Sequence, residues 1–536
     1  MTMWDREASW KRLNDESFDV LVIGGGATGA GAALDAATRG LKVALVERDD
    51  FSAGTSSRST KLIHGGVRYL EKAVKEFDRT QFALVRDALR ERAVLIRLAP
   101  HLARPIPLVT PLYQWYQVPY FRTGLKMYDW LAGKANLSPS RFVDAKEALQ
   151  RFPMLKAEGL RGGVVYYDGQ FDDARMNVAI ALTAAEQGAV VLNHAQVTGL
   201  RKVGGVVRGA TVRDGERDRD VEVEAAAVIN ATGPFSDAIR RMDDPDTKPL
   251  LTASSGIHVV LDARFSPPDT GLLIPETEDG RVLFLLPWLG HTLIGTTDRP
   301  ASIEPHPKAS EDDVEYVLRH VRTYFSVPVE RSDVKASWSG LRPLVSDPDS
   351  ADTARLSRDH VVNRSESGLL TIAGGKWTTY RTMAIDVVDQ AIEASGLSAG
   401  PSRTHDTPLQ GGADFSPTGA GDLQERYGLE PDVASHLNRA YGDRAEQVAS
   451  LAQDEGLESR LANDHPYLEA EVAYAVRYEL ARTSVDVLAR RTRLAFVDRD
   501  AAVRALPRVS EMLAREFGWD ERRQVEDRAD GMAYLV

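Results

Sequence analysis

Residues 18–47 read FDVLVIGGGATGAGAALDAATRGLKVALVE, and this stretch decides the fold. It begins with a short apolar run, passes through three glycines into small residues typical of a helix, and closes with a second apolar run. Two short apolar runs flanked by glycine predict strands that are buried on both faces, as in a parallel sheet. A strand–helix–strand unit of this kind predicts an α/β fold with a doubly wound, Rossmann-like sheet.

The glycines of this unit have the spacing of a dinucleotide-binding turn. Gly24, Gly26 and Gly29 form GxGxxG between the first strand and the helix, with Gly25 inside the turn. The first glycine permits the tight turn, the second lets the backbone approach a pyrophosphate, and the third allows close helix packing. Glu47 ends the second strand, where a carboxylate can accept hydrogen bonds from a ribose. The spacing therefore predicts a dinucleotide cofactor.

Two observations favour FAD over NAD as this cofactor. Two later strands also end in glycine, in VINATG (residues 228–233) and TIAGG (residues 371–375), which indicates that distant parts of the chain return to one sheet. The chain has one good GxGxxG, so a second site for a nicotinamide is not expected. The substrate itself is then expected to supply the electrons.

Composition excludes several classes of function. The 536 residues are 43% hydrophobic and 27% charged, which suits two or three globular domains. The absence of cysteine removes disulfides, iron–sulfur clusters and cysteine nucleophiles. A net charge of −12 argues against a nucleic-acid partner. The 11 histidines show no HxxxH or comparable spacing, so no metal is predicted.

Membrane insertion is not expected from the sequence. No stretch approaches about 18 apolar residues, and the N-terminus mixes charges without an apolar core. The catalytic body is therefore expected in the cytoplasm. Residues 106–130 hold seven aromatic residues with Arg122 and Lys126 nearby. This segment is interpreted either as an interfacial anchor or as an aromatic wall of a cap domain.

Several longer motifs carry a resemblance to a known family. They are SSRSTKLIHGGVRYLE (residues 56–71), DDARMN (172–177), SGLRPLV (339–345) and AGGKWTTYR (373–381). With these motifs placed after the dinucleotide unit, the chain resembles the FAD-dependent glycerol-3-phosphate dehydrogenases of the aerobic, respiratory type. The resemblance covers nearly the whole length, including a helical and polar C-terminal part.

The resemblance implies a fold of class α/β, or α+β overall, in three parts. A discontinuous FAD-binding domain is expected from residues 16–80, 161–240 and 341–395. A substrate-binding cap with a mixed or antiparallel sheet is expected from residues 81–160 and 241–340. Residues 396–536 are expected to form an all-helical domain.

The resemblance also implies an activity. Members of this family bind FAD non-covalently and oxidise glycerol 3-phosphate to dihydroxyacetone phosphate by hydride transfer to flavin N5. They usually pass the electrons to membrane quinone, which implies peripheral contact with the inner face of the cell membrane. A homodimer is left open.

By match to the family motifs, several residues are expected to form the site. Arg68, Arg342 and Lys376 resemble its phosphate and substrate ligands, and His64 and Tyr69 would approach the flavin. His258 matches another active-site histidine. The positions predicted to bind the cofactor are Gly24, Gly25, Gly26, Gly29, Glu47, Ser57, Lys61, Gly233, Gly374 and Gly375. The family commonly has a lysine where this chain has Ser255, so its phosphate affinity is expected to depend more on the arginines.

The chemistry of an alcohol dehydrogenation agrees with these candidates. The reaction needs a base for the hydroxyl proton and positive charge for the phosphate. Arginine offers a planar fork for phosphate, and histidine can accept a proton near neutral pH. Each cation alone is more often a surface group, and each histidine could be a core residue satisfied by the backbone. Residue chemistry does not choose between His64 and His258 as the base.

Two other functions remain open from the residues alone. One is a flavin oxidase of the same architecture that acts on an amino acid or a hydroxy acid with oxygen. The other is a flavin-binding sensor or scaffold without enzymatic activity.

Overall fold

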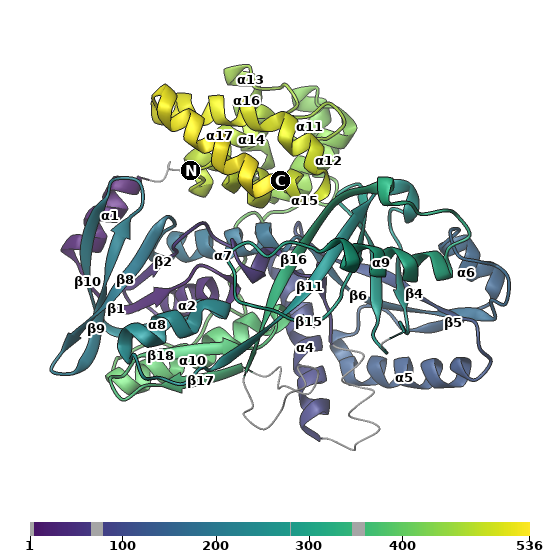
Figure 1. Cartoon of the computed structure of the whole chain (residues 1–536), viewed down its shortest axis with the longest axis horizontal. Coiled ribbons are helices and arrows are strands. Elements are labelled where there is room, and N and C mark those ends of the chain that lie inside the picture. Colours follow the sequence, from purple (N-terminus) through teal and green to yellow (C-terminus); the bar gives the residue numbers. More distant parts are fainter. Residues whose placement is uncertain (1–4, 66–78, 279, 346–359) are drawn as a thin grey trace.

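The structure is a computed structural model that describes residues 5–65, 79–278, 280–345 and 360–536. Two sheets lie side by side, and the C-terminal helices lie together across them (Figure 1). This arrangement confirms the predicted α/β fold with a helical C-terminal part.

The first sheet contains the unit that opened the sequence analysis. Strand β1 pairs in parallel with β2 and β10, as the two apolar runs predicted. Helix α2 (Ala27–Thr38) covers one face of this sheet together with α7 (Asp173–Glu186) and α10 (Tyr380–Ser395). The strands run in the order β17 (His360–Arg364), β18 (Leu370–Gly374), β10 (Arg219–Asn230), β1 (Ser17–Ile23), β2 (Val43–Val46) and β7 (Val190–Leu192), with β8 (Ala195–Val203) and β9 (Val206–Asp214) joined to β10.

The second sheet is mostly antiparallel. Its order is β15 (Arg299–Pro300), β11 (Leu251–Leu261), β14 (His291–Gly295), β13 (Leu283–Trp288), β12 (Gly271–Ile274), β4 (Ala103–Leu112), β6 (Gly162–Phe171) and β3 (Leu62–Ile63), with β16 (Val334–Val345) on β11 and β5 (Arg141–Val143) on β6. Strand β6 therefore belongs to this sheet, although it was predicted within the FAD-binding segment that begins at residue 161.

Helices complete both layers. Beside the second sheet lie α4 (Arg79–Leu98), α5 (Gln117–Ala132), α6 (Ala145–Arg151) and α9 (Glu311–Tyr324), and beside the first lie α1 (Arg6–Asp15) and α8 (Ser236–Asp243). The C-terminal part consists of α11 (Gly419–Tyr427), α12 (Pro431–Tyr441), α13 (Ala445–Glu455), α14 (Glu469–Glu479), the π-helical turn η8 (Asp486–Arg491), α15 (Leu494–Val497), α16 (Arg499–Phe517) and α17 (Glu521–Leu535). Within the described ranges, no helix is both long enough and apolar enough to cross a bilayer.

Buried arginines fasten the C-terminal domain to the rest of the chain. Arg490 and Arg491 both donate to the carboxylate of Asp50, at 2.6 and 2.8 Å. Arg493 donates to the carbonyl of Ser57 at 2.8 Å and to Asp173 at 3.1 Å. Apolar packing continues the same contact, because Trp288 and Trp338 of the second sheet share a core with α15. The domain thus contacts the segment that follows β2.

Replacing Arg493 by methionine is expected to destabilise the fold by about 3–5 kcal/mol, because it removes one partner from a buried ionic network. Arg493 is 1% exposed, and Asp173 would keep its bonds to Lys61, to the hydroxyl and N–H of Ser59, and to the N–H of Ala174. Urea unfolding of the purified variant measures the change. Arg522→Met, an exposed i,i+4 pair on α17, serves as control and should leave the midpoint unchanged. An unchanged midpoint for the Arg493 variant would contradict the assigned role of this contact.

Candidate active site

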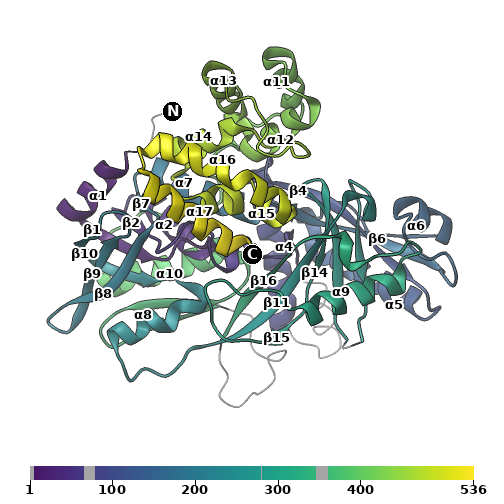
Figure 2. The same ribbon diagram turned by 45° about the horizontal axis from the view of Figure 1, so that its top comes forward.

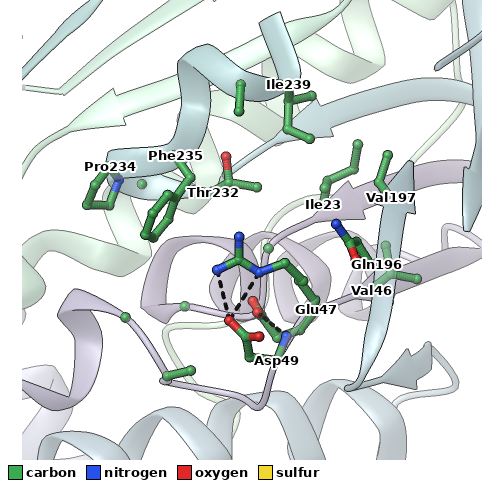
Figure 3. A pocket seen from close by; sticks show the side chains of 18 of the residues that line it. Ile23, Val46, Glu47, Asp49, Gln196, Val197, Thr232, Pro234, Phe235 and Ile239 are labelled. Carbon is green, nitrogen blue, oxygen red and sulfur yellow. Dashed lines mark hydrogen bonds and ion pairs between the residues drawn. The ribbon is translucent and has the colours of Figure 1, made fainter. Parts of the chain in front are cut away.

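A pocket opens where β1 and β2 end, at the turn that the glycine pattern predicted for the cofactor (Figure 3). Figure 3 shows Glu47 and Asp49 on one side of it and Thr232, Pro234 and Phe235 across from them. Four of the predicted cofactor positions line the pocket, namely Gly24, Gly26, Glu47 and Gly233. Gln196 and Val197 from β8 close another side.

The glycines shape this turn by the absence of side chains. Gly24 has a φ of +107°, and a Cβ there would lie 2.8 Å from the carbonyl oxygen of Ala231. A Cβ at Gly29 would lie 1.9 Å from the carbonyl oxygen of Gly24. Helix α2 can therefore start directly beneath the turn, so that its first N–H groups face the pocket. This cradle fits the pyrophosphate of a dinucleotide such as FAD.

Glu47 is held in position by the backbone around it. Its carboxylate accepts hydrogen bonds from the N–H of Gly25 at 2.6 Å and from that of Asp49 at 2.9 Å. Burial raises the pKa of Glu47 above its ordinary value, and the charge of Asp49 adds to this effect. Each carboxylate oxygen keeps a further lone pair, which suits the hydroxyls of a ribose.

Lys61 and Ser57 have different surroundings from those predicted. Neither lines the described pocket. The Lys61 ammonium is fully buried and donates to Asp173 at 2.7 Å and to the carbonyls of Ser57 and Ser59. Burial lowers the pKa of Lys61 to about 8, so its charged form still prevails at neutral pH. Lys61 therefore braces the loop before β3, and we assign the pocket contact to Ser56, whose hydroxyl accepts a hydrogen bond from the N–H of Ala27.

A second group of site residues lies on the second sheet. His258 of β11 is paired across the sheet with Gly295 of β14 and with Trp338 of β16. A Cβ at Gly295 would lie 2.2 Å from the His258 ring, and Trp338 stacks on this ring at 5.4 Å. The hydroxyl of Thr60 lies 2.9 Å from Nε2 of His258. The ring is thus held on three sides.

The surroundings of His258 favour the neutral form of its ring. Burial lowers its pKa well below the ordinary 6.5, and the positive charges of Lys61 and Arg342 lower it further. The described residues offer no hydrogen-bond partner to its buried Nδ1. A buried polar atom without a partner costs free energy, and a ligand hydroxyl could supply that partner. The neutral ring can then act as a hydrogen-bond acceptor.

Arg342 lies on β16 beside this histidine. Its guanidinium contacts Asp298 at 3.1 Å and Thr296 at 2.9 Å, and a Cβ at Gly256 would collide with it. Arg281 binds the other oxygen of Asp298, also at 3.1 Å. Two guanidinium groups contact the same carboxylate, one at each oxygen. Asp298 therefore holds the two guanidinium groups in place.

The other predicted residues that the structure describes lie on or directly after β3, β11 and β18. His64 follows β3 with its ring 6.3 Å from that of Phe284. Lys376 precedes the short helix η6 (Trp377–Thr379), and the Trp377 indole donates to the carbonyl of Ser56 at 2.9 Å. Gly374 and Gly375 end β18 with positive φ. Arg68 and Tyr69 lie outside the described residues. Ser255 bonds the Ser339 hydroxyl at 2.6 Å.

Sequence reasoning gave no role to four residues that the structure places in or beneath the site. They are Ser56, Thr60, Asn177 and Arg281. Asn177 donates to the carbonyl of Gly25 at 2.8 Å and so supports the cofactor turn from α7. Three of the four lie in motifs already singled out, SSRSTK and DDARMN. No motif marked Arg281, since only the fold brings it to Asp298.

The pH dependence of turnover should report the protonation of His258. Arg342 lowers the pKa of this ring, and an anion bound at Arg342 would offset that effect and raise the pKa again. A histidine that accepts the substrate proton must be neutral, so on this hypothesis activity is expected to fall as the pH drops through that pKa. We therefore expect the acid limb of kcat to lie at higher pH than the acid limb of kcat/KM, because kcat reports the complex. Steady-state rates measured down to the lowest pH at which the enzyme stays folded give both limbs. His258→Gln should remove the difference; two coincident limbs would contradict the assignment.

Comparison with known proteins identifies the family. Residues 19–381 match the family model of FAD dependent oxidoreductases, and residues 402–524 match that of the C-terminal domain of alpha-glycerophosphate oxidase. The chain is 52% identical to the mitochondrial glycerol-3-phosphate dehydrogenase of Macaca fascicularis, over 99% of this chain and 75% of that protein. It is 50% identical to the mitochondrial enzyme of that name from Arabidopsis thaliana, over 97% and 86%.

A solved structure agrees over the whole length. The X-ray structure of the glycerol-3-phosphate dehydrogenase from Bacillus halodurans, complexed with FAD, is similar with a TM-score of 0.80 at 30% identity. The match covers 99% of this chain and 97% of that one. The chain therefore belongs to the family of FAD-dependent oxidoreductases and, within it, to the glycerol-3-phosphate dehydrogenases.

Proposed function

We propose that this enzyme oxidises sn-glycerol 3-phosphate to dihydroxyacetone phosphate with FAD and passes the electrons to membrane quinone. The observation that carries the proposal is the neutral, buried His258 beside two arginines that share one carboxylate. This arrangement suits a substrate with a hydroxyl at one end and a phosphate at the other. The names of the relatives that match nearly the whole chain support the same substrate.

Each part of the reaction has a proposed residue. Arg342 and Arg281 bind the phosphate, and His258 accepts the proton of the hydroxyl through Nδ1. When bound, FAD supplies the oxidation itself by accepting the hydride from the alcohol carbon. Glu47 holds the ribose, while the turn at Gly24 and Gly26 holds the pyrophosphate.

Other predicted residues complete the proposal. We place His64 and Lys376 at the junction of the cofactor and the substrate, because both belong to motifs that reach the Ser56–Thr60 loop. Arg68 and Tyr69 stay predictions from the family motif. The predicted domain division also stays a proposal, with the middle FAD-binding segment beginning after β6.

Contact with a membrane is supported by the surface of α5 and of the turn before it, which contains Trp115 and Tyr116. Of the aromatic residues in 106–130, Trp115 and Trp130 are 78% and 76% exposed, and Tyr116 and Tyr120 are also exposed. Arg122 lies on the same helix. Exposed aromatic residues with cations are typical of peripheral binding at a lipid interface. The apolar residues of β4, in contrast, are mostly buried in the sheet.

Replacing Trp115 and Trp130 by serine together is expected to weaken membrane binding about tenfold or more, because both side chains leave the interface. Co-sedimentation with vesicles of mixed neutral and anionic phospholipid measures the change. Phe142→Ser, another exposed aromatic residue of the cap, is the control. Equal binding by the double variant and the parent would contradict this role of α5. Turnover with a soluble dye acceptor should stay at the parental level in both.

Anaerobic titration of the FAD-loaded enzyme tests the substrate. We expect glycerol 3-phosphate to bleach the flavin absorbance, and a quinone analogue to restore it faster than oxygen does. Bleaching by an amino acid or a hydroxy acid alone would indicate the oxidase instead. No bleaching by any of these compounds would indicate a flavin-binding sensor. If only oxygen restored the flavin absorbance, glycerol 3-phosphate would still be the substrate, but quinone would not be the electron acceptor.

A further inference from the structure

Three potential metal ligands meet where the second sheet faces the C-terminal domain. His291 begins β14, His465 lies in the turn before α14, and Asp498 caps the N-terminus of α16. One ligand atom from each residue lies within 4.8 Å of the other two. Figure 2 shows α15, which directly precedes Asp498, on the side of the helical domain that faces this sheet. A search for short ligand spacing could not find the cluster, because its members come from two domains.

The distances within the cluster suit a shared ion better than a direct hydrogen bond. Nε2 of His465 lies 3.5 Å from Oδ2 of Asp498, which is long for a hydrogen bond to a carboxylate. Two ligands of a tetrahedral zinc ion with bonds of about 2.0–2.1 Å are about 3.3–3.4 Å apart. The imidazole rings of His291 and His465 lie 5.5 Å apart with planes only 6° from parallel.

Two of the three ligands are also oriented by a second hydrogen bond, and the third by ring stacking. Nδ1 of His291 lies 3.0 Å from the carbonyl oxygen of Leu289, which fixes the proton there and leaves the lone pair of Nε2 for an ion. Oδ1 of Asp498 accepts the N–H of Ala501 at 2.9 Å, so Oδ2 remains for coordination. His465 is buried and stacks on Tyr467 at 5.9 Å. Such outer bonds, from a histidine to a carbonyl in particular, are typical of metal sites.

We propose that His291, His465 and Asp498 bind a divalent transition-metal ion, with Zn²⁺ as the best match and water in the fourth position. Two imidazoles and one carboxylate form a ligand set that zinc accepts, and the partial exposure of His291 and Asp498 leaves room for the water. The site is structural. It joins the β13–β14 hairpin to the C-terminal domain, and the far end of β14 is Gly295, against which His258 packs.

Neighbouring charges set the expected affinity. Lys335 lies near Asp498, and Asp262 lies near His291. The lysine opposes a cation and the aspartate favours it, so one carboxylate remains as the net charge of the site. We therefore expect micromolar rather than picomolar binding of zinc.

The test uses the FAD-loaded enzyme after treatment with a chelator, with Co²⁺ as an optical probe and Zn²⁺ as its competitor. We expect one equivalent of Co²⁺ to give d–d absorption at wavelengths beyond the flavin bands. Zn²⁺ should displace it and raise the unfolding temperature. His291→Gln should abolish the absorption. Asp498→Asn should weaken it at least tenfold, although asparagine still caps α16.

A surface histidine–aspartate pair provides the control. His405 and Asp406 are 2.9 Å apart and exposed, and no third ligand lies within reach among the described residues. His405→Gln should therefore bind Co²⁺ as the parent does. Absence of saturable binding by the parent, or equal binding by His291→Gln, would overturn the proposal. So would a loss of stability in Asp498→Asn that is the same with zinc as with chelator, since that result indicates a simple ion pair.

Discussion

The FAD content of the purified protein is expected to fall to a trace when Gly29 is replaced by alanine. The new Cβ would lie 1.9 Å from the carbonyl oxygen of Gly24, and the obstacle is backbone that belongs to the cofactor turn itself. To remove this clash, α2 and the turn would have to move about 1 Å apart. Such a movement costs considerable free energy in a closely packed interior. The ratio of flavin to protein absorbance measures the effect, and the unfolding temperature should fall with it.

A glycine elsewhere in a helix provides the matched control for this variant. Gly421 of α11 has no atom near the position of an added Cβ. Gly421→Ala is expected to keep full FAD content and to gain up to about 1 kcal/mol of stability, because alanine favours the helix. If Gly29→Ala kept one FAD per protein, the turn would tolerate displacement. The claim that close packing requires glycine at this position would then be wrong.

Local pattern was enough to predict the cofactor unit. Strands β1 and β2, the helix α2 between them and the turn at Gly24 are contiguous, so the apolar pattern and the glycine spacing of this short segment are enough to predict them. The family model and the FAD-bound relative confirm the cofactor and the family. Domain boundaries were harder, because β6 pairs with β4 and β5 across loops that no local pattern describes.

The substrate side of the site depends on sheet register. Arg342 and His258 are 84 residues apart in sequence, and the β11–β16 pairing brings them onto adjacent strands. Arg342 lies opposite Ser254, and its guanidinium reaches along β11 to Gly256. The histidine could be proposed from a motif, but its low pKa results from burial and from Lys61, which a motif does not show. Lys61 itself illustrates the limit of a motif. The resemblance suggested a cofactor ligand, whereas the ammonium is bound to Asp173 beneath the loop.

Replacing Arg342 by methionine is expected to lower kcat/KM for glycerol 3-phosphate by about 10²–10³-fold. Loss of a charge-assisted contact to a phosphate corresponds to about 3–4 kcal/mol at 1.4 kcal/mol for each tenfold change. Methionine keeps most of the apolar stem, and Arg281 keeps its bond to Asp298, so the sheet should remain folded. FAD content should not change, because Arg342 does not line the cofactor pocket.

A substrate without phosphate distinguishes anion binding from general damage to the site. Glycerol lacks the group that Arg342 is proposed to bind, so the slow rate of flavin reduction by glycerol should be similar in the parent and in Arg342→Met. Arg264→Met, an exposed cation of the same domain, should resemble the parent with both substrates. If Arg342→Met lost the same factor in rate with glycerol as with glycerol 3-phosphate, the role of Arg342 would be to hold Asp298 and Thr296 and not to bind phosphate. Because Arg342 also lowers the pKa of His258, the variant should shift the acid limb of kcat/KM to higher pH.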